Sequence, residues 1–127
     1  MRILLVADST WVVEDVIAAL SEARFQVTSL SDPARVAEAA AEAGADVVIA
    51  DLQVGSMGGM AVIRRVRAAV QAGRLGPTPT LLLLDRGVDA FIARRAGADA
   101  WVRKPFGSFA LRDLVDGLVP AAHPDPA

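Results

Sequence analysis

Three charged residues stand where short apolar runs of the sequence end. Asp51 closes a run of valine, isoleucine and alanine and opens a glycine-containing loop, while Asp8 and Lys104 each follow another apolar run. Buried parallel strands read as such runs, and open α/β sheets bind ligands in the crevice at the carboxyl ends of their strands. Two carboxylates and one ammonium group gathered there favour phosphoryl chemistry or metal binding.

The elements that would position these residues alternate along the chain. Runs too short and too β-branched for helices predict strands at residues 2–7, 25–29, 46–50, 81–84 and 100–103. Apolar residues at helical spacing predict helices at residues 11–23, 33–43, 58–72, 88–96 and 108–118. This alternation predicts a parallel α/β sheet with right-handed crossovers and helices on both faces.

Two helices allow more detailed predictions. Asp32 before Pro33 predicts an N-cap followed by proline at the first helical position. The first helix is expected to turn five apolar residues inward: Val12, Val16, Ala19, Leu20 and Ala23. The helix at 58–72 is expected to turn four residues inward and three arginines outward: Met60, Ile63, Val66 and Val70 against Arg64, Arg65 and Arg67.

The composition predicts one domain and excludes several kinds of chemistry. The chain has 127 residues, of which 54% are hydrophobic, and no apolar run approaches the ~20 residues that span a membrane. The absence of cysteine excludes disulfides, thiolate catalysis and cysteine-type zinc sites, and fits a cytoplasmic location. The single histidine, His123, lies near the end of the chain, so histidine-based catalysis in the domain is excluded.

Charge and the two ends of the chain complete this picture. A net charge of −2 and a pI of about 5.3 argue against nucleic-acid binding. The first strand begins directly after Met1, so we expect no signal peptide. Residues 1–119 are expected to form the domain, and the proline-rich residues 120–127 a tail or the start of a linker.

Five short motifs follow one another on the alternating units, at residues 4–8, 45–51, 57–60, 96–101 and 104–106. In this order and spacing they resemble the CheY-like receiver domain of bacterial two-component response regulators, from residue 1 to about 118. The resemblance implies a flavodoxin-like (βα)5 fold with strand order 2-1-3-4-5. It also implies a signalling module rather than an enzyme, with a phosphoryl group accepted at the end of the third strand.

Carried over residue by residue, the resemblance assigns a role to each charged strand end. Asp51 matches the phosphoacceptor, Asp8 the acid that binds magnesium, and the Gln53 carbonyl the backbone metal ligand. Lys104 matches the lysine that contacts the phosphoryl group, and Pro105 the proline that follows it, often through a cis bond.

The chain departs from the family pattern at two positions. Ala7 stands where a second acid is usual, so we expect weak Mg²⁺ binding. Trp101 matches an aromatic that rotates on activation. Leu84 stands where the fourth strand usually ends in a hydroxyl, so the coupling between phosphorylation and rotation of Trp101 should be weak or differently built. Trp101 as a static surface aromatic is the alternative. Asp85 is open between a metal ligand, a partner of Arg86 and a solvent-exposed acid.

These features leave two main hypotheses. The first is a receiver that takes a phosphoryl group from a histidine kinase, a phosphotransfer protein or a small phosphodonor, and contacts a downstream protein or a second copy through residues 88–118. The second is a degenerate receiver that binds proteins through the same residues without phosphorylation. A flavodoxin-like cofactor binder is disfavoured, because Asp8 stands where a phosphate-binding loop would need glycine.

Overall fold

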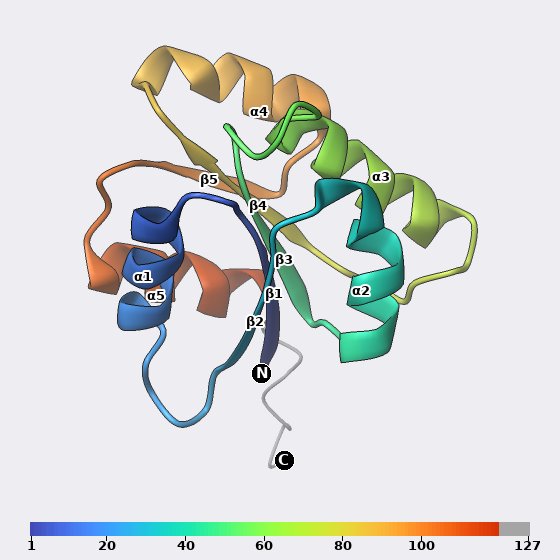
Figure 1. The fold of residues 1–127 in the computed structure, drawn as a ribbon, viewed down its shortest axis with the longest axis horizontal. Coiled ribbons are helices and arrows are strands. Elements are labelled where there is room, and N and C mark those ends of the chain that lie inside the picture. Colours follow the sequence, from blue (N-terminus) through green and yellow to red (C-terminus); the bar gives the residue numbers. More distant parts are fainter. Residues whose placement is uncertain (120–127) are drawn as a thin grey trace.

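A parallel five-stranded sheet forms the centre of the fold, in the order β2-β1-β3-β4-β5 (Figure 1). The computed structural model describes residues 1–119; the predicted tail lies outside the described residues. The strands are β1 (Arg2–Val6), β2 (Gln26–Leu30), β3 (Val47–Asp51), β4 (Thr80–Leu84) and β5 (Ala100–Arg103). The predicted flavodoxin-like fold and its strand order are confirmed.

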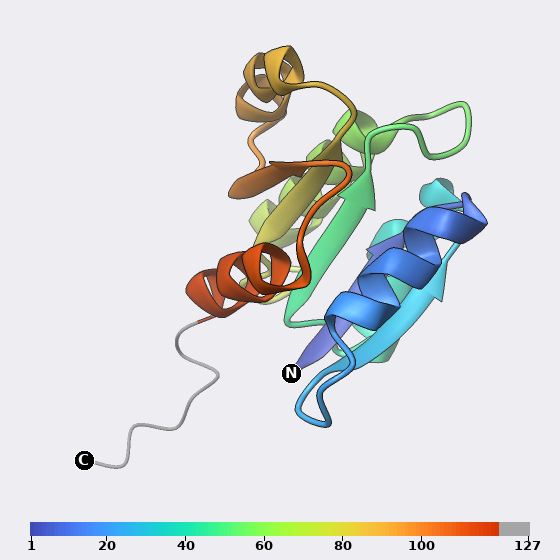
Figure 2. The same ribbon diagram turned by 90° about the vertical axis from the view of Figure 1, so that its left-hand side faces the viewer.

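Helices cover both faces of the sheet (Figures 1 and 2). They are α1 (Thr10–Ala19), α2 (Val36–Ala43), α3 (Gly59–Gln71), α4 (Ala90–Ala96) and α5 (Ser108–Leu118). Helices α1 and α5 pack on one face, and α2, α3 and α4 pack on the other. Because each crossover connects parallel strands, all five strands end at the same edge of the sheet.

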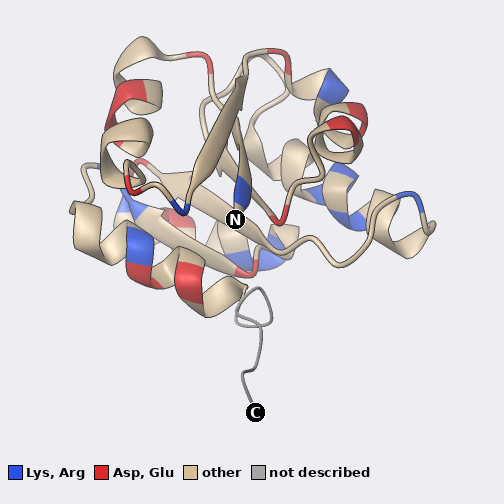
Figure 3. Cartoon of the chain, turned by 90° about the horizontal axis from the view of Figure 1, so that it is seen from below, with Lys and Arg blue, Asp and Glu red and all other residues tan. Residues whose placement is uncertain are grey.

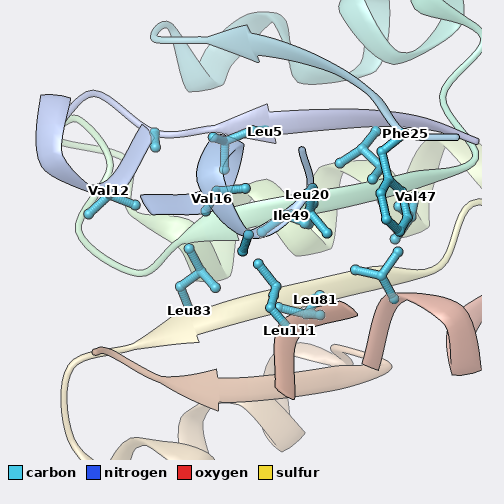
Figure 4. Close-up of a cluster of buried hydrophobic side chains, with 14 residues drawn as sticks. Leu5, Val12, Val16, Leu20, Phe25, Val47, Ile49, Leu81, Leu83 and Leu111 are labelled. Atoms are coloured by element: carbon cyan, nitrogen blue, oxygen red, sulfur yellow. The ribbon is translucent and has the colours of Figure 1, made fainter. Parts of the chain in front are cut away.

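The core consists of two apolar layers separated by the sheet. Successive side chains of a strand point to opposite faces, so Ile3 and Leu5 of β1 face α1 and α5, whereas Leu4 and Val6 face α2 and α3. Figure 4 shows the first layer, in which side chains of α1 and α5 meet those of the three central strands. This two-sided burial explains why the strands read as continuous apolar runs.

The first helix is shorter than predicted. Helix α1 ends at Ala19, because Leu20 caps it and a turn follows that is closed by the Phe25 N–H donating to the Glu22 carbonyl at 3.0 Å. This turn delivers Phe25 to the core and leaves Ala23, which was predicted to face inward, exposed. Burial of the aromatic ring, and not helix propensity, therefore decides where the helix stops.

Two other helices begin with a 3₁₀ turn, at Pro33–Arg35 and Gly87–Asp89. The predicted N-cap is confirmed, since the Asp32 carboxylate accepts a hydrogen bond from the Ala34 N–H at 3.1 Å. Helix α2 ends at Gly44, whose φ of 60° is a left-handed conformation that glycine adopts without a steric cost.

The inward face of α3 is rotated relative to the prediction. Ile63 and Val66 are buried as expected, but Val62 and Ala69 complete the buried stripe. Met60 and Val70 are half-buried at its margin. The three arginines point outward as predicted: Arg64, Arg65 and Arg67.

Charges of opposite sign lie mostly on different helices (Figure 3). Helices α1 and α2 carry only acidic residues, α3 and α4 carry only arginines, and α5 carries both signs. Within the described residues, no helix combines the length and the apolar character needed to cross a bilayer.

Candidate functional site

Four charged side chains lie at the carboxyl edge of the sheet, each at or just beyond the end of a different strand. Asp51 is the last residue of β3, Asp85 and Lys104 come directly after β4 and β5, and Asp8 lies two residues beyond β1. The backbone aligns them, because Val6 of β1 pairs with Ala50 of β3 and the Lys104 N–H donates to the Leu84 carbonyl at 2.7 Å. The sheet thus brings together residues that lie almost one hundred positions apart in the sequence.

Asp51 and Lys104 form a buried ion pair at the centre of this edge. Their side chains are 2% and 5% exposed, and the Lys104 ammonium donates a hydrogen bond to Oδ1 of Asp51. The Gln53 N–H donates to the same oxygen at 3.4 Å. No buried side-chain oxygen within residues 1–119 lacks a hydrogen-bond partner. Since no donor among those residues reaches Oδ2 of Asp51, that oxygen carries the small exposed fraction of the carboxylate.

Asp85 is the second carboxylate on Lys104. Its Oδ1 lies 3.0 Å from the Lys104 ammonium nitrogen, and its side chain is 36% exposed. Burial alone would lower the pKa of Lys104, but Asp51 and Asp85 together raise that pKa above its ordinary value. Burial alone would raise the pKa of Asp85, but Lys104 and Gln53 hold it below its ordinary value. Lys104 and Asp85 are therefore both charged near neutral pH.

This contact gives Asp85 a role outside the three that sequence reasoning left open. It does not form an ion pair with Arg86, whose guanidinium lies 3.4 Å from Asp89 instead. Its carboxylate is directed to Lys104, so it is more than a solvent-exposed acid. The sequence signal was its place directly after a strand, which Lys104 shares.

Asp8 anchors the loop that follows Asp51. Its exposed carboxylate accepts a hydrogen bond from the Gly55 N–H at 2.8 Å through Oδ2. Gly59, which begins α3 at the end of this loop, lies against the end of β3. A Cβ at Gly59 would come within 2.6 Å of the Asp51 carbonyl oxygen and 2.7 Å of the Leu82 side chain. Only glycine fits there, so the loop and the helix are held closely behind Asp51.

The donors at this edge fit a hard cation. Mg²⁺ prefers carboxylate, carbonyl and water oxygens, and it usually keeps several of its waters. Asp8 and Asp51 supply carboxylates from neighbouring strands, and the Gln53 carbonyl follows within two residues of Asp51. Within residues 1–119, no three acidic or histidine side chains lie close enough to hold a metal by themselves. A bound ion would therefore depend on the backbone and on water.

Sequence reasoning missed one aromatic residue of the site. Lys104 lies 5.7 Å from the ring centroid of Trp11, within the range of a cation–π contact. Trp11 is 52% exposed on the first turn of α1, so its ring lies beside the Lys104 ammonium while remaining accessible. Its position three residues after Asp8 was the available signal.

The residues expected to form the switch lie on the face of the sheet that α2, α3 and α4 cover. Leu84 is fully buried there and presents no polar atom to the site. Trp101 is half-buried on the same face, with the Arg94 guanidinium 5.7 Å from its ring centroid. The Lys104–Pro105 peptide bond is cis.

Comparison with known proteins agrees with this architecture. The pattern of the response regulator receiver domain matches residues 3–116. Sensory transduction protein RegX3 of Mycobacterium tuberculosis is 30% identical over 114 residues, which cover 89% of this chain and 47% of RegX3. The chain thus spans about half the length of this curated relative.

Solved structures share the fold. A putative response regulator from Chloroflexus aurantiacus superposes with a TM-score of 0.81 at 26% identity, covering 94% of this chain and 97% of that one. The receiver domain of sensor histidine kinase PA1611 from Pseudomonas aeruginosa has a TM-score of 0.73 at 22% identity, with coverage of 94% and 97%. The latter likeness shows the fold alone; that domain holds a magnesium ion in its active site cleft.

The match to the receiver pattern runs through all five strands and ends within the last helix. The structure independently has the strand order that the resemblance implied. The chain therefore belongs to the response regulator receiver domains, the signalling modules of two-component systems.

Proposed function

We propose that Asp51 accepts a phosphoryl group from a histidine kinase or a phosphotransfer protein, and that this modification switches protein–protein contacts. The buried pair of Asp51 and Lys104 carries the proposal. The lysine holds one carboxylate oxygen and leaves Oδ2 toward solvent, where a phosphodonor can approach. A carboxylate oriented in this way is a nucleophile that needs no general base.

The transfer can be written with these groups. Oδ2 of Asp51 attacks the phosphorus of a phosphohistidine, and the bond between phosphorus and the imidazole nitrogen breaks. The electron pair of that bond leaves with the imidazole, and an acyl phosphate remains on Asp51. Lys104 stays bound to Oδ1 and offsets the negative charge that gathers on the phosphoryl oxygens.

Asp8, Asp51 and the Gln53 carbonyl would hold Mg²⁺ for this reaction. When bound, the ion supplies positive charge that neutralises the phosphoryl oxygens. Ala7 adds no carboxylate to this set and is itself buried. A site with one acid fewer than its relatives binds the ion more weakly, so millimolar Mg²⁺ is the range to test.

Residues 88–118 would carry the signal outward. Three large apolar side chains stand out of this segment, with exposures of 70%, 62% and 75%: Val88, Phe91 and Phe109. Apolar groups exposed to this extent on a small domain favour contact with a partner protein or a second copy of the chain.

The second candidate function is a receiver that binds partners without phosphorylation. Two observations favour it. Leu84 fills the switch position with an apolar side chain, and Lys104 already has two carboxylate partners. In that case the ion pair would serve stability alone.

A labelling experiment separates the two. The full chain is incubated with Mg²⁺ and radiolabelled acetyl phosphate, and protein-bound label is measured before and after hydroxylamine, which cleaves acyl phosphates. We expect hydroxylamine-sensitive label on the wild type and on Asp113→Asn, which removes an exposed acid of α5, but none on Asp51→Asn. Absence of label on the wild type, or label that persists in Asp51→Asn, would overturn the proposal.

A further inference from the structure

Asp85 forms an ion pair with the Lys104 ammonium, the same group that would bind a phosphorylated Asp51. Lys104 has three N–H donors and contacts one oxygen of Asp51 and one oxygen of Asp85. A phosphoryl group on Asp51 would add three acceptor oxygens and a charge of roughly −1.5 to −2 next to the same lysine. The Asp85 carboxylate would then face a stronger anion in competition for one cation.

The surroundings of Asp85 allow it to leave. Its side chain is 36% exposed, and its only ion-pair partner among residues 1–119 is Lys104. The residue before it, Leu84, is buried and fixed by the Lys104 N–H. The backbone can therefore pivot after Leu84, and Asp85 can move to solvent without opening the core.

The turn after Asp85 can carry this movement to α4. The Arg86 N–H donates to the Asp89 carboxylate at 2.9 Å, and the Asp89 N–H donates to the Arg86 carbonyl at 3.0 Å. These bonds tie Arg86 to the residue that precedes Ala90, where α4 begins. A shift of Asp85 is therefore expected to move the turn as a unit, together with the exposed Val88.

We propose that Asp85 is a displaceable counter-charge, which binds Lys104 while Asp51 is unmodified and is expelled when Asp51 carries a phosphoryl group, moving the Gly87–Asp89 turn and the start of α4. This inference rests on the proposed phosphorylation of Asp51. In this scheme, repulsion between Asp85 and the phosphoryl group moves the loop after β4. This repulsion takes the place of the attraction that a strand-end hydroxyl would exert and that Leu84 cannot provide.

The test uses beryllofluoride with Mg²⁺, a mimic of an aspartyl phosphate, and amide NMR spectra of the full chain. The variants are Asp85→Asn, Asp85→Glu, which keeps the charge, and Asp113→Asn as a control for net charge. We expect Asp85→Asn to bind beryllofluoride about tenfold more tightly than the wild type, since no like charge has to be displaced. Asp85→Glu and Asp113→Asn should stay within about twofold of the wild type.

The spectra add a readout that affinity alone does not give. In the wild type, beryllofluoride should shift the amides from Arg86 to Phe91. In Asp85→Asn those amides should already lie near the shifted positions before the ligand is added, so that beryllofluoride changes them little.

Two failures can be told apart. If the wild type binds beryllofluoride at Asp51 but Asp85→Asn shows the same affinity and the same amide shifts, the counter-charge role is wrong and the proposed phosphorylation stands. If neither protein binds at millimolar Mg²⁺, the proposed function fails and this inference fails with it.

Discussion

Replacing Lys104 by methionine removes the ammonium group and keeps an aliphatic side chain of similar length. The Asp51 carboxylate, 2% exposed, would then keep the Gln53 N–H at 3.4 Å as its only hydrogen-bond donor within residues 1–119. Removing one partner of a buried ion pair costs about 3–5 kcal/mol, because the other charge stays buried without compensation. We expect Lys104→Met to lower the free energy of unfolding by about 3 kcal/mol, at the low end of that range.

The converse replacement is expected to cost much less. In Asp51→Asn the lysine keeps Asp85 at 3.0 Å, and Asp85 reaches solvent, so neither charge is isolated. The asparagine amide has the shape of the carboxylate and loses only the charge-assisted part of one hydrogen bond, about 1 kcal/mol. The two variants should therefore differ by about 2 kcal/mol although both break the same contact.

Urea unfolding followed by far-UV circular dichroism, in EDTA to exclude metal, measures this difference. The slope of the free energy against urea should be the same in both variants, so that the midpoints report stability. Lys104→Met should also melt roughly 10 °C below the wild type. If Lys104→Met costs no more than Asp51→Asn, Asp51 is not stranded by loss of the lysine, and our account of the buried pair is wrong.

Three further outcomes follow from the same structure. Gly59→Ala should lower the free energy of unfolding, measured by urea unfolding, by about 1–3 kcal/mol, because its Cβ would overlap the backbone of β3. Gly117→Ala in α5 is the control: its Cβ would meet nothing within 4 Å, so it should be neutral or stabilising. Leu84→Thr should cost about 2 kcal/mol but enlarge the shift of the Trp101 indole resonance when beryllofluoride binds; an unchanged shift would contradict our account of the missing hydroxyl. Burial pushes the pKa of Asp85 upward, but the neighbouring ammonium and amide groups hold it below its ordinary value. The contribution of Asp85 to stability is thus present above the unfolded pKa and lost as the pH falls below about 4. Circular dichroism should therefore show the wild type losing stability more steeply with acid than Asp85→Asn. Equal slopes of stability against pH would refute the pairing of Asp85 with Lys104.

Much of the site could be predicted because it depends on strand ends. A buried parallel strand appears in the sequence as a continuous apolar run. The residue at its end lies at the carboxyl edge of the sheet, whatever the details of packing. Asp51, Asp8 and Lys104 were found in this way, and they lie at one edge of the sheet in the structure.

Other features depended on contacts between distant segments. The end of α1 was misplaced because the burial of Phe25, and not local propensity, sets the turn that follows. The buried face of α3 was rotated because Gly59 packs against β3 more closely than a side chain would allow, which brings Val62 and Ala69 inward.

Local pattern therefore determined the fold class and the acids and lysine at the strand ends, whereas the strand order came from the family resemblance. Only the tertiary structure decided which of these charges meet. The contacts of Lys104 with both Asp51 and Asp85, and the ring of Trp11 beside it, join four segments of the chain. The physical reason is that ion pairing acts over a few ångströms, and such distances between segments far apart in sequence are set by the packing of the sheet.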